Sequence, residues 1–338
     1  MNLTQTTLPE PQTACHTPRA THHAPRTTPS AFTLVEILVT ISLLAFIILG
    51  LFAMFNQVQR AFRSSMNQVD QLEAGRAVVE ILPRELEQIT PSRASGPNGV
   101  NFYALIRGST PLTQSLPGTP VLRTNLLEDC FMLVRQNQTW TGIGYCVRTN
   151  DGAGGLWLPE SIPGQVMGAG SLYRYSATIN VLRNDGLPAD VSQLYSNFVY
   201  SAQPGSTAIS NRICDGVIHF RLQAFATNGF PIYVDNSSQA RFRTNAYNMG
   251  SCMVKQASGN VSYLYPDNWF GLYFWSNAVP ASVELEIGVL EQRAWERYNS
   301  IGAASARLAY LRREEISSRV QLFRQRIPIR NVDPSAYQ

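Results

Sequence analysis

The feature that most constrains this chain is an uninterrupted apolar run near its N-terminus. Residues 32–55 contain a single charged side chain, Glu36. At a rise of 1.5 Å per residue, a helix of this length spans the hydrocarbon core of a bilayer. The run is longer than the apolar region of a secretory signal peptide, and no small-residue cleavage site follows it. We therefore predict a single-pass transmembrane helix over residues 32–55.

The segments on either side of this run differ from it in composition. Residues 1–31 are rich in Thr, Pro and His and show no apolar period, which predicts a disordered leader. After the run, apolar residues recur at spacings of three, four and seven up to Ile89. This pattern predicts an amphipathic helix over residues 56–90 that continues the membrane helix. Pro83 lacks a backbone donor, so we expect a kink or a break there.

Strand patterns dominate residues 91–338, which we predict to form one globular β-rich domain. Residues 91–125 and 228–262 are expected to be mostly loop because turn-forming residues are frequent there, with at most a short strand over residues 102–106. We expect one helix over residues 294–315. The expected strands cover residues 130–134, 144–148, 171–182, 195–201, 217–226, 269–275, 283–290 and 320–329. The order predicts an α+β fold, in which a long N-terminal helix packs on a mostly antiparallel sheet and a helix follows late in the chain.

The segment Ala31-Phe32-Thr33-Leu34-Val35-Glu36 resembles the prepilin cleavage and methylation motif, and the likeness covers residues 30–55. The chain is thus similar to type IV pilin-like proteins. The resemblance implies that a prepilin peptidase at the inner membrane cuts between Ala31 and Phe32 and methylates the new amine of Phe32. The family usually has Gly where this chain has Ala31. The resemblance also implies a cytoplasmic leader, a periplasmic or extracellular C-terminal domain, and other pilin or pseudopilin subunits as partners.

Glu36 is the candidate assembly residue. A charged side chain inside a membrane helix is costly, so such a residue is a functional candidate by default. In a growing filament, the amine of Phe32 from one subunit can meet Glu36 of its neighbour and neutralise it. Two other interpretations stay open: a Glu36 that lies in the headgroup region without a role, and a plain single-pass anchor.

A second and shorter resemblance lies further along the chain. The segments around Ile213-Cys214-Asp215-Gly216-Val217 and Val279-Pro280-Ala281-Ser282-Val283 look similar to the C-terminal half of J-type minor pseudopilins of type II secretion systems. Residues 73–77 and 84–88 look similar to the helix of the same group. The insertions at 91–125 and 228–262 and the helix after Leu290 go beyond that pattern.

The residues that carry enzyme chemistry are scarce. His219 is the one histidine left after leader removal, so zinc hydrolase and Ser-His-Asp arrangements lack ligands or a base. We expect no enzymatic activity, no cofactor and no metal. The basic excess of +4 is too small to predict nucleic acid as a partner. The alternative is a binding module on the same anchor, an adhesin-like or DNA-capturing head that would use Arg241, Arg243, Arg324 and Arg326.

Four cysteines remain once Cys15 leaves with the leader. An oxidising compartment outside the inner membrane favours their pairing. If the hairpin that contains Cys130 and Cys146 is centred on Gln138, these two cysteines face each other across the strands, within the reach of a disulfide. Cys214 and Cys252 then pair by elimination.

The motif generates a direct prediction about processing. The mature, membrane-bound chain should begin at Phe32, because the composition changes abruptly there and the motif places the cut after Ala31. N-terminal sequencing or intact-mass measurement of the membrane fraction checks this. A mature chain that begins at any other residue contradicts it.

Overall fold

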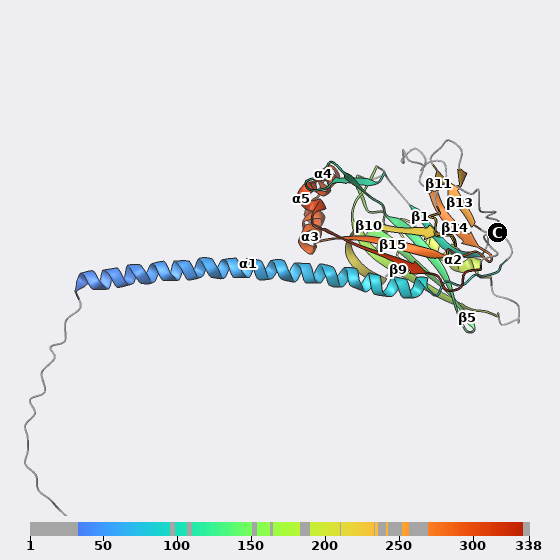
Figure 1. Cartoon of the computed structure of the whole chain (residues 1–338), viewed down its shortest axis with the longest axis horizontal. Coiled ribbons are helices and arrows are strands. Elements are labelled where there is room, and N and C mark those ends of the chain that lie inside the picture. The colour runs from blue at the N-terminus through green and yellow to red at the C-terminus, as the bar shows by residue number, and fades with distance from the viewer. Residues whose placement is uncertain are drawn as a thin grey trace, which may run out of the picture. The chain divides into compact units, whose positions relative to one another are not determined.

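The computed structural model describes residues 33–94, 99–106, 110–150, 154–162, 165–182, 190–209, 211–232, 234–235, 241–242, 252–256 and 270–333 (Figure 1). The leader predictions, including Ala31 and Phe32, lie outside these residues. The chain divides into two compact units, residues 1–60 and 61–338. The helix α1 (Leu34–Leu86) contributes to both units.

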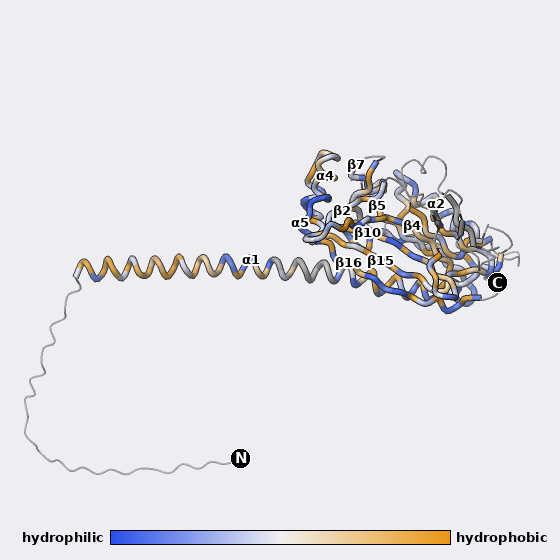
Figure 2. The backbone as a smooth tube through the Cα atoms, turned by 45° about the horizontal axis from the view of Figure 1, so that its top comes forward, coloured by the Kyte–Doolittle hydropathy of each residue, from blue (hydrophilic) through white to orange (hydrophobic). Residues whose placement is uncertain are grey.

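The first described stretch of α1 is apolar and uncovered. Residues Leu34–Arg63 are long and apolar enough to cross a membrane, and none of this stretch is buried inside the chain. Figure 2 shows the hydrophobic colour running along this part of the helix. The prediction of an N-terminal apolar helix is confirmed.

The second unit is built on one curled sheet whose strand ladders are antiparallel, which confirms the α+β prediction. Neighbouring strands along the chain are mostly neighbours in the sheet. The strands are, in sheet order, β13 (Cys252–Gln256), β14 (Phe270–Trp275), β1 (Val100–Ile106), β4 (Glu128–Gln136), β5 (Thr139–Asn150), β9 (Gly170–Asn180), β10 (Asn211–Phe225), β15 (Ser282–Leu290) and β16 (Val320–Pro328), with β6 (Leu156–Trp157) paired to β5.

These strands confirm seven of the eight expected ones, whereas two expected loops carry extra strands. Residues 91–125 hold β1, which confirms the short strand expected over residues 102–106, and in addition the hairpin of β2 (Leu112–Ser115) and β3 (Leu122–Asn125). Residues 228–262 hold β13 and the short pair β11 (Val234–Asp235) and β12 (Arg241–Phe242). A further pair, β7 (Glu160–Ile162) and β8 (Val166–Met167), completes the described strands. Turn-forming residues between short strands had made these segments resemble loops.

The C-terminal part of α1 supplies the core of the inner sheet face. Val78, Leu82 and Leu86 of α1, together with Ile89 just beyond its end, are buried in one cluster with side chains of β1, β4, β10 and β15. Gly75 permits a close approach, because a Cβ atom there would clash with the ring of Phe323 on β16. The last part of the predicted apolar stripe thus faces the sheet, as a helix of period 3.6 requires, whereas Val58, Phe62 and Met66 from its first part are exposed.

The expected break at Pro83 does not occur, since α1 continues through it to Leu86. Pro83 lies in the last turn of the helix, where few hydrogen bonds remain to be lost, and Leu82 and Leu86 on either side are fully buried. Packing therefore outweighs the missing donor. Helix bonding ends with Glu87 N–H donating to the Pro83 carbonyl at 2.9 Å.

A charged contact fixes this end of α1 on the sheet. The carboxylate of Glu85 accepts hydrogen bonds from Arg174 at 2.7 and 3.0 Å and from the hydroxyl of Tyr145 at 2.6 Å. Burial, and then the neighbouring Glu85 carboxylate, raises the pKa of Tyr145 far above its usual range, so its hydroxyl stays a donor. Three donors on one carboxylate set the rotation and axial position of the helix.

The outer face of the sheet is covered by α2 (Ser192–Ser201), where a strand was expected over residues 195–201. That prediction was wrong. Leu194, Phe198 and Ser201 are buried at the spacing of a helix, but the aromatic residues of the segment had favoured a strand. Beneath the end of α2, Arg148 pairs with Asp129 through two hydrogen bonds of 2.6 and 2.8 Å, and it also donates to the carbonyl of Ala202. This buried arginine neutralises Asp129 and satisfies the C-terminal end of the helix.

Three short helices replace the single helix expected over residues 294–315. They are α3 (Gln292–Ser300), α4 (Ala304–Leu311) and α5 (Glu314–Ser317), and together they connect the end of β15 to the start of β16. Trp295, Tyr298, Leu308 and Leu311 pack into a separate apolar cluster. The extended backbone of Ala303 and Arg313 interrupts the helix twice.

The curl of the sheet is closed by a seam between residues 126–128 and β10. Leu127 bridges to Phe220, and the Phe220 N–H donates to the Leu126 carbonyl at 2.7 Å. Two residues further along β10, the partner is a side chain in place of a backbone carbonyl. The buried carboxyl of Glu128 accepts a hydrogen bond from the Leu222 N–H at 2.7 Å. Burial raises the pKa of Glu128 from its ordinary 4.5 to about 7, while Leu222 N–H and Arg221 oppose this rise and Glu286 adds to it.

Replacing Glu85 by Gln is expected to lower the free energy of unfolding by about 1–2 kcal/mol, because a half-buried Arg174 loses its counter-charge. Denaturant unfolding of the full chain in detergent, followed by tryptophan fluorescence, measures this. Glu80→Gln is the matched control on the same helix, since its pair with Arg76 is largely exposed and should contribute at most about 0.5 kcal/mol. Equal losses for both variants would contradict the role of Glu85.

Glu128 makes stability depend on pH. A carboxyl whose pKa is higher in the folded protein binds its proton more tightly there, so stability falls as the pH rises from 4.5 through about 7. Glu128→Gln keeps an acceptor for Leu222 and removes the ionisation. Above pH 7 the variant should be more stable than the original chain by about 3 kcal/mol, and the gap should close towards pH 4. Unfolding free energies across this range check the prediction, which a pH-independent gap would overturn.

Candidate functional site

The first turn of α1 holds the one acidic residue of the apolar stretch. Glu36 Oε2 accepts hydrogen bonds from the Thr33 N–H and the Thr33 hydroxyl, both at 3.0 Å. In return, the Glu36 N–H donates to Thr33 Oγ1 at 3.3 Å. Thr33 precedes the helix and its carbonyl accepts from Ile37 N–H, so the two residues form a capping box.

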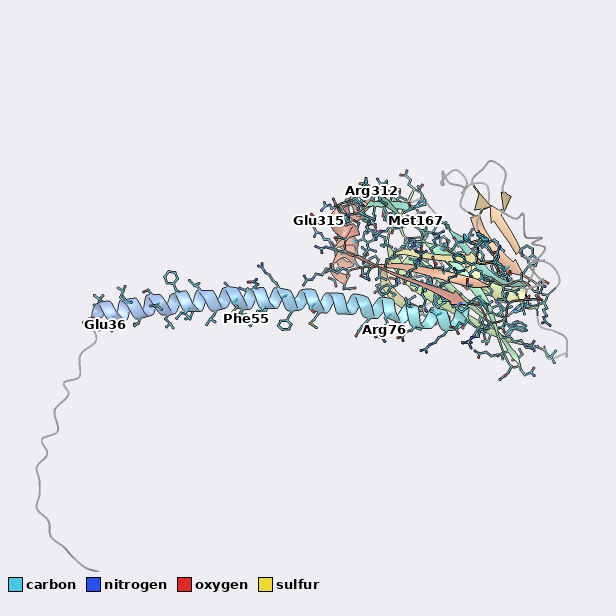
Figure 3. All side chains as sticks on the ribbon, in the orientation of Figure 1. Glu36, Phe55, Arg76, Met167, Arg312 and Glu315 are labelled. Atoms are coloured by element: carbon cyan, nitrogen blue, oxygen red, sulfur yellow. The ribbon has the colours of Figure 1, made fainter. Side chains whose placement is uncertain are left out.

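This arrangement leaves half of the carboxylate available. Oε1 of Glu36 has no hydrogen-bond partner among the described residues, and Glu36 is exposed. Figure 3 shows Glu36 at the start of α1 and Phe55 further along the same helix. The cap itself is worth about 1 kcal/mol of helix stability. An exposed anion at the very start of an apolar helix is therefore the most distinctive chemical group of this unit.

Thr33 is the site residue that the sequence interpretation missed as a partner of Glu36. The signal was present, because Thr-x-x-Glu before an apolar run is the pattern of a capping box. Ala31 and Phe32, the two residues of the predicted cleavage site, lie outside the described residues.

The predicted pairing of Cys130 with Cys146 is wrong. The hairpin has a two-residue loop, so Cys130 lies opposite Tyr145 and Phe131 opposite Gly144. This is one residue away from the register that we expected, and a shift of one residue turns side chains to opposite faces of a sheet. Cys130 accordingly packs in the apolar cluster between the sheet and α1, and Cys146 packs in the cluster between the sheet and α2.

No disulfide joins Cys130, Cys146 and Cys214 in the structure. Cys214 carries a free, buried thiol that donates to the Asp215 carbonyl at 3.4 Å, and burial raises its pKa to about 12. The side chain of Cys252 lies outside the described residues, so the predicted Cys214–Cys252 bond is not seen. Burial raises the pKa of Cys130 as well, which leaves both thiols protonated and unreactive.

The arginines proposed for a binding head do not gather into one described patch. Arg324 pairs with Glu284 at 2.5 Å and with Glu286 at 3.2 Å, and Arg326 stacks over Phe225 at 3.9 Å. Arg241 lies on β12, and Arg243 lies outside the described residues.

The remaining candidate groups have structural partners. His219 Nδ1 accepts from the Leu126 N–H at 3.1 Å, and its Nε2 lies 3.4 Å from Glu286. That hydrogen bond, followed by Arg221 and Arg324, holds the pKa of Glu286 below its ordinary value despite partial burial. Within the described residues no group of three or more His, Cys, Asp or Glu side chains is placed to hold a metal ion.

The comparisons with known proteins add no relative. No family model matches the chain, and neither a curated protein nor a solved structure matches it.

Proposed function

We propose that this chain is a non-enzymatic, membrane-anchored subunit of a filament, a minor pilin or pseudopilin of a type IV pilus or of a type II secretion-like system. The observation that carries the proposal is the uncovered apolar helix Leu34–Arg63, which begins with a capped carboxylate and continues into the core of a folded head. An anchor alone needs the apolar helix but not the carboxylate.

The proposed route starts with the precursor in the inner membrane. Its leader is cytoplasmic and its head is periplasmic or extracellular. Prepilin peptidase cuts between Ala31 and Phe32 and methylates the amine of Phe32. The new cationic amine then lies next to Thr33, close along the chain to the carboxylate that Thr33 caps.

Assembly then joins this amine to the Glu36 carboxylate of the neighbouring subunit. The uncommitted Oε1 is the atom that would receive it, while Oε2 stays engaged by Thr33. A lone carboxylate costs roughly 2.5–3.5 kcal/mol near the centre of a membrane helix and less towards the interface. Contact with a cation removes this cost and fixes the axial register of the two helices, which supports the assembly role.

The decisive variants separate the charge of Glu36 from its capping function. Glu36→Gln keeps a carbonyl oxygen for Thr33 but removes the charge, and Glu36→Ala removes both. Both variants should insert and fold yet be absent from filaments. Thr33→Val keeps the charge and loses the cap, which costs about 1 kcal/mol, and should still assemble.

Co-purification of the tagged variants with sheared filaments measures assembly, and membrane fractionation measures insertion. If Glu36→Gln and Glu36→Ala enter filaments as well as the original chain, Glu36 is not an assembly contact. If Thr33→Val fails together with Glu36→Ala while Glu36→Gln assembles, the cap is the requirement and the charge is not.

A further inference from the structure

The strand β16 and the docked part of α1 run side by side in the same direction. Near the start of β16, Phe323 packs on Gly75. Near its end, Arg330 forms an ion pair with Glu87, and Asn331 donates to the Ile89 carbonyl at 2.9 Å. Val320, the first residue of β16, therefore lies at the end of the sheet where α1 first reaches it.

The helices α3, α4 and α5 gather at that same end, as Figure 1 shows. Leu290 pairs with Val320 in the sheet, so the three helices begin and end there. The tip of the β2–β3 hairpin is tied to α5, because the Gly118 N–H donates to Glu314 at 3.0 Å and the Ser317 hydroxyl to the Ser115 carbonyl at 2.5 Å.

This end presents exposed apolar and basic side chains together. Val121 and Leu122 at the hairpin tip are 59% and 61% exposed. Residues 291–319 carry six arginines and four glutamates. In the part of the chain that the structure describes, only Arg319 among these arginines forms an ion pair, with Glu291. We call the set of Val121, Leu122, Arg293, Arg297, Arg312 and Arg313 the arginine face; Figure 3 labels Arg312 near Glu315.

We propose that the arginine face binds the surface of an anionic bilayer, the same one that α1 crosses. Arginines beside exposed apolar side chains are the chemistry of interfacial membrane contact. The apolar stretch ends at Arg63, twelve residues before Gly75, which is about 18 Å along a helix. A bilayer around the apolar stretch would thus end about 18 Å along α1 from Gly75, the residue on which Phe323 of β16 packs.

A bilayer suits this face better than a protein partner does. A stable protein interface covers about 800 Å² on each side with complementary shape. Among the described residues of this end, two exposed apolar residues of a hairpin and the arginines of the neighbouring helices do not make a continuous apolar surface of that size, whereas a lipid surface adapts to separate side chains. The inference rests on the proposed membrane anchoring, so its test must report insertion and docking separately.

The experiment uses the full chain in vesicles of phosphatidylcholine or of an equal mixture with phosphatidylglycerol. A fluorescent probe on Val121→Cys reports contact through quenching by headgroup-labelled nitroxide lipid, with the labelled original chain as background. We expect strong quenching in anionic vesicles, weaker quenching in neutral ones, and relief by salt. Arg312→Gln and Arg313→Gln should each lower the ratio of docked to undocked head about fivefold in anionic vesicles.

Two controls belong to the far end of the sheet. A probe on Gln138→Cys, in the β4–β5 turn, should stay unquenched, and Arg135→Gln should leave the Val121 signal unchanged. A chain that co-floats with vesicles while its Val121 probe stays unquenched overturns the arginine face alone. Quenching that ignores lipid charge and both arginine substitutions overturns it too. A chain that floats with neither vesicle type defeats the anchor and the arginine face together.

Discussion

The structure depends on one constraint: the first part of α1 has an apolar surface that the chain itself does not cover. Sixteen large apolar side chains between Leu34 and Phe55 are exposed. Moving them out of water is worth roughly 25–50 kcal/mol, at about 1.5–3 kcal/mol each, which exceeds the whole stability of a typical domain. Lipid or other helices would take this stretch out of water, while the head folds on the second part of the same helix.

The sequence predicts most where a pattern is long and has one cause. The apolar run can be identified from the local sequence alone, because an uninterrupted apolar segment of this length is typical of a membrane-spanning helix. The strand β15 is equally clear, since Val283, Leu285 and Ile287 alternate with polar residues and all three are buried. The carboxylate at Glu36 could be singled out for the same reason, as one charge in an apolar run. Even its partner Thr33 follows from a local motif of four residues.

The failures arise where the outcome depends on groups far apart in the chain. α2 contains Tyr195 and Phe198, which favour a strand by composition, but the sheet face under them selects a helix. The register of the β4–β5 hairpin depends on whether its loop has two residues or three. Because the loop has two, the side chains of Cys130 and Cys146 lie on opposite faces of the sheet. The helix survives Pro83 because buried neighbours hold it, and no local pattern encodes that packing.

The arginine face and the apolar helix act on very different energy scales, and this sets their order of importance. Two exposed arginines contribute about 1 kcal/mol each at an anionic surface, and this falls further with salt. Burial of the apolar helix is more than tenfold larger. In the proposed filament subunit, docking of the head would therefore orient the chain at the membrane without resisting its transfer to a filament. Under the proposed function, transfer of the helix from lipid to neighbouring helices depends on interactions of the helix itself, where a single buried charge such as Glu36 is comparable to two or three of the arginines together.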